Sequence, residues 1–280
     1  MSKGLLDPKV DFVFKNIFGS PNHPEILISF LNATLKAKKK IVNVDIKKTD
    51  IEKQYIEDKY SRLDVKATTS NDEIINIEIQ LKNENNMVKR SLYYLSKMYE
   101  EQLNEKEDYS KLVRTVCINI LNFKYLKTDN FHTGYRFKEI ESNEELTDIM
   151  EVHFIEIPKL QDSSDEKDML VAWTEFLKDP ESEKVRGLEL SIEEIRQAKD
   201  ELIRMSNDST QRELYDMRAN SLRDKMSELN AAERKGIEKG REEGREEGRK
   251  EGRKEGIEEG RKEEKIKIAR NMKLSGLDTN

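Results

Sequence analysis

The sequence predicts a mixed α/β (α+β) protein with a helical C-terminal region and a charged repeat tail, on three observations. Strict alternation of apolar and polar residues over residues 60–82 predicts two half-buried strands joined by a polar turn. The patterns around this hairpin follow the order helix–strand–strand–strand–helix–strand, and behind them glycine recurs at every fourth residue. We therefore expect a core with appended strands (1–160), a helical region (161–232), a charged spacer (233–264) and a short amphipathic end helix (265–280).

Two helices and a first strand are expected before the hairpin. Residues 9–19 place apolar side chains at helical spacing, and the sequence Gly-Ser-Pro that begins at Gly19 stops this helix. Residues 25–36 carry a second helical pattern. The apolar residues around Val44 predict the first strand.

The hairpin itself brings two acidic residues together. Apolar residues occupy the odd-numbered positions of both strands, and the turn consists of residues that tolerate turn geometry. If the turn is centred on Asn71, Asp64 lies opposite Glu78 on the polar face. Facing side chains in an antiparallel pair have Cβ atoms about 5 Å apart, and two carboxylates at that distance repel by roughly 3 kcal/mol at an effective dielectric constant near 20.

Something must offset the repulsion between these two carboxylates. A shared proton, a neighbouring cation or a bound metal would do so. Magnesium fits oxygen ligands of this kind, since it commonly takes one or two carboxylates and keeps several waters. The alternative is a solvated strand face on which Arg62, Lys66 and Lys82 neutralise the acids.

One helix and three strands are expected after the hairpin. In residues 87–103, five apolar side chains share one side of a helix, which we expect to face the core: Val88, Leu92, Leu95, Tyr99 and Leu103. Residues 112–121 form an almost continuous apolar run, as expected for a strand buried on both faces. Two further strands are expected at residues 131–140 and 149–157.

The region that follows is predicted to be helical. An apolar stripe around Trp173 belongs to a helix that stops before Pro180, and we interpret Trp173 as a packing residue rather than a base-stacking one. Ser191 is a candidate helix N-cap, with Glu194 completing a capping box.

The tail has a different composition, in which glycine alternates with Arg, Lys and Glu. Each glycine in a helix costs about 1 kcal/mol relative to alanine, and a spacing of four residues drifts about 40° per repeat around a helix of 3.6 residues per turn. Ile237 and Ile257 are nearly the only apolar residues, so there is no heptad seam. We expect a marginal, highly solvated helix or a fluctuating spacer; the alternative is a rod for self-association or for tracking DNA.

Composition excludes several classes of protein. The one cysteine, Cys117, lies in an apolar run and indicates a buried residue; it rules out a disulfide within the chain. Neither a signal peptide nor an apolar run of membrane-spanning length is visible, which favours a cytoplasmic protein without membrane partners. No phosphate-binding glycine loop or zinc motif is convincing, the histidines are scattered, and we expect no small-molecule cofactor.

The hairpin residues resemble the signature of the PD-(D/E)XK nuclease superfamily, an Asp on one strand and Glu-x-Lys on the next. Here Asp64 is followed by Glu78-Ile79-Gln80, with Gln in place of Lys. This variant resembles the recombination-promoting nuclease (Rpn) family, also described as transposases. The resemblance covers about residues 5–177 and the tail, and it implies a restriction-endonuclease-like αβββαβ core. The flanking stretches that resemble the family are DPKVDFVFKNIFG, RSLYYLSKMYEEQL, DYSKLVRTVCINILNF and VHFIEIPKL.

The resemblance implies a metal-dependent DNA endonuclease of low sequence specificity that promotes recombination or acts with mobile DNA. Asp64, Glu78 and the backbone carbonyl of Ile79 would bind Mg²⁺, with Mn²⁺ as the alternative, and Gln80 would orient the attacking water. Paired cuts would favour a homodimer.

Other residues are open candidates for the same site. An N-terminal acid often joins the metal in this superfamily, and both Asp11 and Glu25 are candidates. Lys82 is a candidate for the positive charge that Gln80 lacks. Contacts to DNA phosphates are expected from six basic residues: Lys15, Lys38, Lys39, Lys40, Arg90 and Lys97.

A second function stays open at this point. Gln80 carries no charge, and the formal net charge of the chain is −6. Both observations favour a catalytically weak or inactive nuclease-fold protein that acts as a DNA- or partner-binding oligomer. Any DNA binding would then depend on local basic patches.

Overall fold

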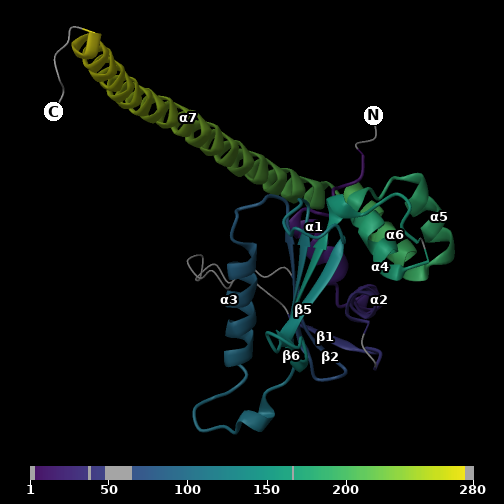
Figure 1. Cartoon of the computed structure of the whole chain (residues 1–280). Helices are drawn as coiled ribbons and strands as arrows, with labels where there is room; N and C mark the ends of the chain where they lie inside the picture. The colour runs from purple at the N-terminus through teal and green to yellow at the C-terminus, as the bar shows by residue number, and fades with distance from the viewer. Residues whose placement is uncertain (1–3, 37–38, 48–64, 166, 275–280) are drawn as a thin grey trace. The chain divides into compact units, whose positions relative to one another are not determined.

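The computed structural model of the chain describes residues 4–36, 39–47, 65–165 and 167–274 (Figure 1). The chain divides into two compact units, residues 1–220 and 221–280, and each is described by itself.

Six described strands form one mixed sheet in the first unit, in the order β1-β2-β3-β4-β6-β5 (Figure 1). The pairs β3–β4 and β4–β6 are parallel, and the other three pairs are antiparallel. The strands are β1 (Val44–Lys47), β2 (Val65–Thr69), β3 (Ile74–Gln80), β4 (Thr115–Leu121), β5 (His132–Lys138) and β6 (Glu145–Glu156).

Helices cover both faces of the sheet, which is how a mixed α/β domain buries its apolar layers. One helix, α3, packs on one face against β4 and β6, and the remaining helices of the unit lie on the other side (Figure 1). The chain order is therefore helix–strand–strand–strand–helix–strand, as predicted. The helices are α1 (Asp11–Phe18), α2 (Pro24–Leu35), α3 (Met87–Glu100), α4 (Met169–Lys178), α5 (Glu183–Ser191) and α6 (Glu193–Asn207).

The β2–β3 hairpin has the predicted register. Val65 faces Ile77, and Ala67 faces Ile75, so the residues pair symmetrically about Asn71. In the turn, Asp72 takes a left-handed backbone conformation with φ of 59°, which Asp tolerates better than most residues. The prediction from alternation and turn chemistry is therefore confirmed for the described part of the hairpin.

The α3 helix buries a different stripe from the predicted one. The predicted stripe included Val88 and Leu92, and both are exposed. Only Leu95 is buried as predicted. The helix also ends at Glu100, before Leu103. The reason is that α3 carries apolar residues on two adjacent stripes, and the sheet selects the one that faces it: Met87, Ser91, Tyr94, Leu95 and Met98.

The opposite face of the sheet carries an aromatic core. Phe18, on α1, lies edge-on to Phe30 of α2 and to Trp173 of α4. Trp173 is fully buried, and its Nε1 lies 3.2 Å from Ser29 Oγ, so its one polar atom is satisfied. The interpretation of Trp173 as a packing residue is confirmed.

The predicted capping box at Ser191 is wrong. Ser191 is the last residue of α5, and Ile192 occupies the N-cap of α6 without a side-chain hydrogen bond. The side-chain cap belongs instead to α5, where Ser182 Oγ accepts a hydrogen bond from the N–H of Val185. Ile192 alone separates α5 from α6, and Ser191 lies inside α5, so it does not cap α6.

The β5–β6 hairpin extends beyond the core. The second strand begins at Glu145, earlier than predicted. Its first half is largely exposed and polar, so the sequence pattern resembles a loop there. Only the second half, from Glu151, is buried in the sheet. Apolar periodicity thus predicted only the buried part of β6 and not the full length of the strand.

The tail is helical. The helix α7 (Ser209–Leu274) runs through the glycine repeat, and Ala219 is its one buried residue among those described. A Cβ added to Gly240 or Gly248 would meet nothing within 4 Å. Of the two expectations for the repeat, the structure agrees with the highly solvated helix, and α7 continues to Leu274, within the segment expected to form a separate end helix. In the described residues, no helix combines the length and the apolar character that crossing a membrane would take.

Candidate active site

The site is organised around Glu78, the third residue from the end of β3. Its side chain is 2% exposed, although it carries a carboxylate. It lies on the face of the sheet that α3 covers, because Asn119, its neighbour on β4, contacts Ser91 of that helix. A buried carboxylate needs hydrogen bonds or an opposite charge, so the partners of Glu78 define the site.

Two side chains donate to one oxygen of Glu78. Arg90, from the first turns of α3, has its Nε 3.1 Å from Glu78 Oε1 and its Nη2 in contact with the same atom. Gln80, two residues along β3, has its Nε2 3.4 Å from Oε1. Within the described residues, Oε2 receives no hydrogen bond. One oxygen is therefore held by two side chains, and the other has no donor among the described residues.

The charges of Arg90 and Glu78 stabilise each other. Burial disfavours the charged guanidinium of Arg90, but the hydrogen bond and the negative charge of Glu78 favour it more strongly. The pKa of Arg90 is therefore raised above its ordinary value. The guanidinium carbon also lies 5.3 Å from the centre of the Tyr94 ring, a cation–π distance.

Further polar residues continue from Glu78 beneath α3. Ser91 Oγ lies 2.8 Å from Asn119 Oδ1, and Asn119 Nδ2 donates to the carbonyl of His153. Asn76 is buried, and its Oδ1 has no partner in the described part of the chain. Sequence reasoning missed these residues because a lone Asn or Ser in a strand or helix matches no motif, and only the packing of α3 on β3 and β4 brings them together. The signal that could have found them is that Asn76 and Glu78 interrupt the isoleucines of the same strand.

Comparison with known proteins identifies the family. A family model described as PD-(D/E)XK nuclease family transposase matches residues 8–232, most of the chain. The chain belongs to this family. No curated protein and no solved structure matches it.

Two of the residues expected at a PD-(D/E)XK site are placed together by the structure. Glu78 and Gln80 lie on β3 and contact each other, and Ile79 between them is buried. Asp64 lies outside the described residues, so its position opposite Glu78 stays a prediction. The described neighbours of that position, Val65 and Ile77, face each other.

The additional acids expected for the nuclease site have other partners. Asp11, the first residue of α1, has Oδ2 3.6 Å from Arg218 Nη1. Glu25, in the first turn of α2, has Oε1 3.2 Å from His23 Nδ1. Neither is among the described contacts of Glu78, and both stay candidates. Lys82 is half-buried just beyond β3.

The basic residues expected to bind DNA lie in different settings. Lys39 and Lys40 are exposed, Lys15 is half-buried and Lys38 lies outside the described residues. Lys97 is paired with Glu100 at 2.9 Å, and the hydrogen bond to Glu100 raises its pKa. Arg90 differs from these lysines, because its guanidinium contacts the buried carboxylate of Glu78 on β3.

A second polar cluster lies on the opposite face of the sheet from Glu78. His132 Nε2 lies 2.9 Å from His153 Nδ1, and His153 Nε2 lies 2.7 Å from Glu151 Oε1. Arg114 joins Glu151 to Glu73 through its two terminal nitrogens. The histidines looked scattered in the sequence because they are 21 residues apart, and only the β5–β6 register brings them together.

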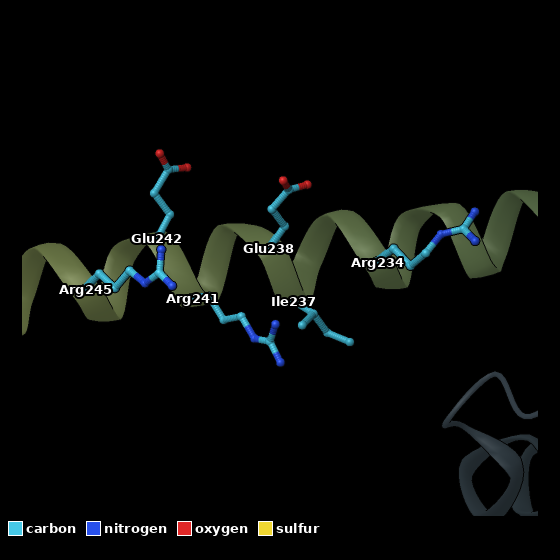
Figure 2. Close-up of a pocket in the computed structure, with 6 residues that line it drawn as sticks. All are labelled: Arg234, Ile237, Glu238, Arg241, Glu242 and Arg245. Carbon is cyan, nitrogen blue, oxygen red and sulfur yellow. The ribbon is translucent and has the colours of Figure 1, made fainter.

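Two other features are not sites. Cys117 is buried, and burial raises the pKa of its thiol to about 12, so it is no nucleophile. A shallow hollow follows consecutive turns of α7, and its lining side chains project along one helix (Figure 2). A single helix cannot enclose a ligand, so we assign no site there. The hollow is lined by Arg234, Ile237, Glu238, Arg241, Glu242 and Arg245.

Proposed function

We propose that this chain is a metal-dependent DNA endonuclease of low sequence specificity that promotes recombination or acts with mobile DNA. Membership of a nuclease family transposase group supports the nuclease reaction. One structural observation carries the proposal further: Glu78 is buried, its Oε1 is held by Arg90 and Gln80, and its Oε2 has no donor among the described residues. A carboxylate arranged in this way suits a metal that binds one oxygen.

The residues of the site fit Mg²⁺. Magnesium prefers oxygen ligands and commonly takes one or two carboxylates while it keeps several waters. Glu78 Oε2 suits one such position, and we propose Asp64 and the carbonyl of Ile79 for two others, with Mn²⁺ as the alternative ion. The described residues contain no group of three His, Cys, Asp or Glu side chains that could hold a metal. The proposal therefore depends on Asp64.

The chemistry divides between the metal and the side chains. A bound Mg²⁺ ion would activate a water and neutralise charge that develops on the phosphate. Glu78 would hold the ion, and Gln80 would orient a water through its amide, which donates and accepts hydrogen bonds but carries no charge. Arg90 supplies the positive charge that contacts Glu78.

A second candidate function is DNA or partner binding without cleavage, in an oligomer. The neutral side chain of Gln80 favours it, since the usual motif has a lysine at this position to polarise the water. In that case the chain would keep the nuclease fold but cleave DNA slowly or not at all.

Nicking of supercoiled plasmid with Mg²⁺, Mn²⁺ or Ca²⁺ separates these two functions. The variants are Asp64→Asn and Glu78→Gln, which keep side-chain shape, and the control is Glu100→Gln, an exposed acid on α3. We expect the wild type and the control to nick the plasmid and both site variants to lose at least 100-fold in rate. Linear product in addition to nicked circles would indicate paired cuts by a homodimer.

The opposite result is equally clear. A folded wild type that shifts DNA on a gel but nicks it with none of the three metals would refute the nuclease proposal and favour the binding function. Equal loss of activity in the Glu100 variant would show that the effect of the site variants is not specific to the metal ligands.

A further inference from the structure

Among the described residues, Arg90 is the charged group in direct contact with the carboxylate of Glu78. Its Nε lies 3.1 Å from Oε1, and its Nη2 contacts the same oxygen. Both contacts fall on one carboxylate oxygen, so the guanidinium does not bridge Oε1 and Oε2 in the usual bidentate manner. Arg90 therefore holds Glu78 by one oxygen, and its described contacts do not involve the other.

The surroundings hold Arg90 in this position. Its guanidinium carbon is 5.3 Å from the ring centre of Tyr94, which is buried on the sheet side of α3. The next residue, Ser91, is buried and contacts Asn119 of β4, which fixes how closely α3 approaches the sheet. The guanidinium thus lies between an aromatic ring and a carboxylate, and its place follows from the packing of α3.

This geometry differs from that of a DNA-binding arginine. A residue that contacts phosphates keeps its charge toward solvent, as the exposed Lys89 does in the same turn of α3. Two of the three guanidinium nitrogens of Arg90, Nε and Nη2, instead contact Glu78, whose side chain is almost fully buried. The charge of Arg90 is largely balanced by Glu78 before any DNA is present.

We propose that Arg90 is the positioning residue of the metal site, which orients Glu78 through Oε1 so that Oε2 faces the metal. This inference rests on the proposed function. It also assigns a role to a cation from α3 in a chain whose signature lysine is replaced by Gln80. Side chains that hold the ligands of a metal, without touching it, typically contribute 10–100-fold to affinity or activity when they are removed.

The first measurement is Mn²⁺ binding to the full chain without DNA, by isothermal titration calorimetry. Three variants are compared with the wild type: Arg90→Gln, Arg90→Lys and Lys89→Gln. Removal of Arg90 should weaken Mn²⁺ binding by about 10–100-fold. The lysine variant should recover part of this loss because it keeps the charge and one donor, and the Lys89 variant should bind as the wild type does.

The second measurement is the rate of plasmid nicking as a function of DNA and salt concentration. For Arg90→Gln we expect kcat to fall while KM for DNA and its salt dependence stay unchanged, because Arg90 acts through Glu78. A phosphate contact would behave differently: its loss raises KM and reduces the slope of log affinity against log salt by about one.

These results can overturn the inference separately from the proposed function. Wild-type Mn²⁺ binding that Arg90→Gln leaves unchanged, with a raised KM for DNA, would make Arg90 a phosphate contact and leave the nuclease proposal intact. A wild type that binds no Mn²⁺ would refute both. If Arg90→Gln loses its circular dichroism spectrum, the folded Arg90→Lys variant decides: unchanged Mn²⁺ affinity and unchanged kcat there would overturn the positioning role.

Discussion

His132 on β5 and His153 on β6 lie in one plane, with Nε2 of the first 2.9 Å from Nδ1 of the second. Their ring planes differ by only 13° and their centroids are 5.1 Å apart. With the nitrogens this close, a centroid separation of that size means that the rings meet edge to edge rather than face to face. The contact is therefore a hydrogen bond between two imidazoles, and Glu151 accepts from the far side of His153.

This histidine pair predicts a pH dependence of stability. Burial, followed by the charges of His153 and Lys36, lowers the pKa of His132 to about 4. An unfolded histidine titrates near 6.5, so between about pH 6.5 and 4 the unfolded chain binds a proton that the folded chain does not. The free energy of unfolding should fall over this range, by on the order of 2 kcal/mol between pH 7 and 5.

Urea unfolding at pH 7 and at pH 5 measures this effect. The wild type should lose more stability between the two values than His132→Gln, and the difference is the contribution of His132. The control is His23→Gln, which removes a histidine whose side chain is 41% exposed. An equal pH effect in the wild type and in His132→Gln would show that His132 takes up its proton in the folded protein.

The cation Arg114 should be essential for stability. It contacts Glu73 and Glu151 across the sheet, and its side chain is 15% exposed. Arg114→Met would leave two buried carboxylates without their shared cation, which costs about 3–5 kcal/mol in comparable buried pairs. Arg196→Met removes a pair with Glu193 whose arginine is 57% exposed, and we expect a change below about 1 kcal/mol. Chemical denaturation compares the two.

The corrected face of α3 can be tested with two leucines three residues apart. Leu95 is 2% exposed and packs in the sheet-facing cluster, whereas Leu92 is 49% exposed. Leu95→Ala should lower the free energy of unfolding by about 2–5 kcal/mol, and Leu92→Ala by about 0.5 kcal/mol or less. If Leu92→Ala lowers the free energy of unfolding more than Leu95→Ala does, in thermal or urea unfolding, the stripe first predicted from the sequence faces the core.

The glycine repeat should tolerate and even favour substitution. A Cβ at Gly240, Gly244 or Gly248 meets nothing within 4 Å, and each helical glycine costs about 1 kcal/mol relative to alanine. The triple alanine variant should therefore show a helix signal at 222 nm that persists to higher temperature. The cooperative unfolding of the first unit should not move, since these residues lie in the second. Loss of helicity would indicate that the glycines make close contacts with another chain.

Several features of this protein follow from short stretches of sequence. The register of the hairpin came from alternation and from the turn around Asn71, and the structure pairs Val65 with Ile77 as predicted. The solvated character of α7 came from its near lack of apolar residues. Such features are predictable because neighbouring residues alone determine the periodicity of a strand or helix and the chemistry of a turn.

Contacts between elements were decided only by tertiary structure. The pattern of α3 allowed two apolar stripes, and the choice between them depended on which side chains the sheet offers. That choice brings Arg90 to Glu78, 12 residues away, and the β5–β6 register brings His132 to His153. The sequence by itself determined the order of the core elements and the carboxylate Glu78, whereas several element boundaries needed the structure. The partners of these side chains depend on packing across the sheet, which local periodicity does not encode.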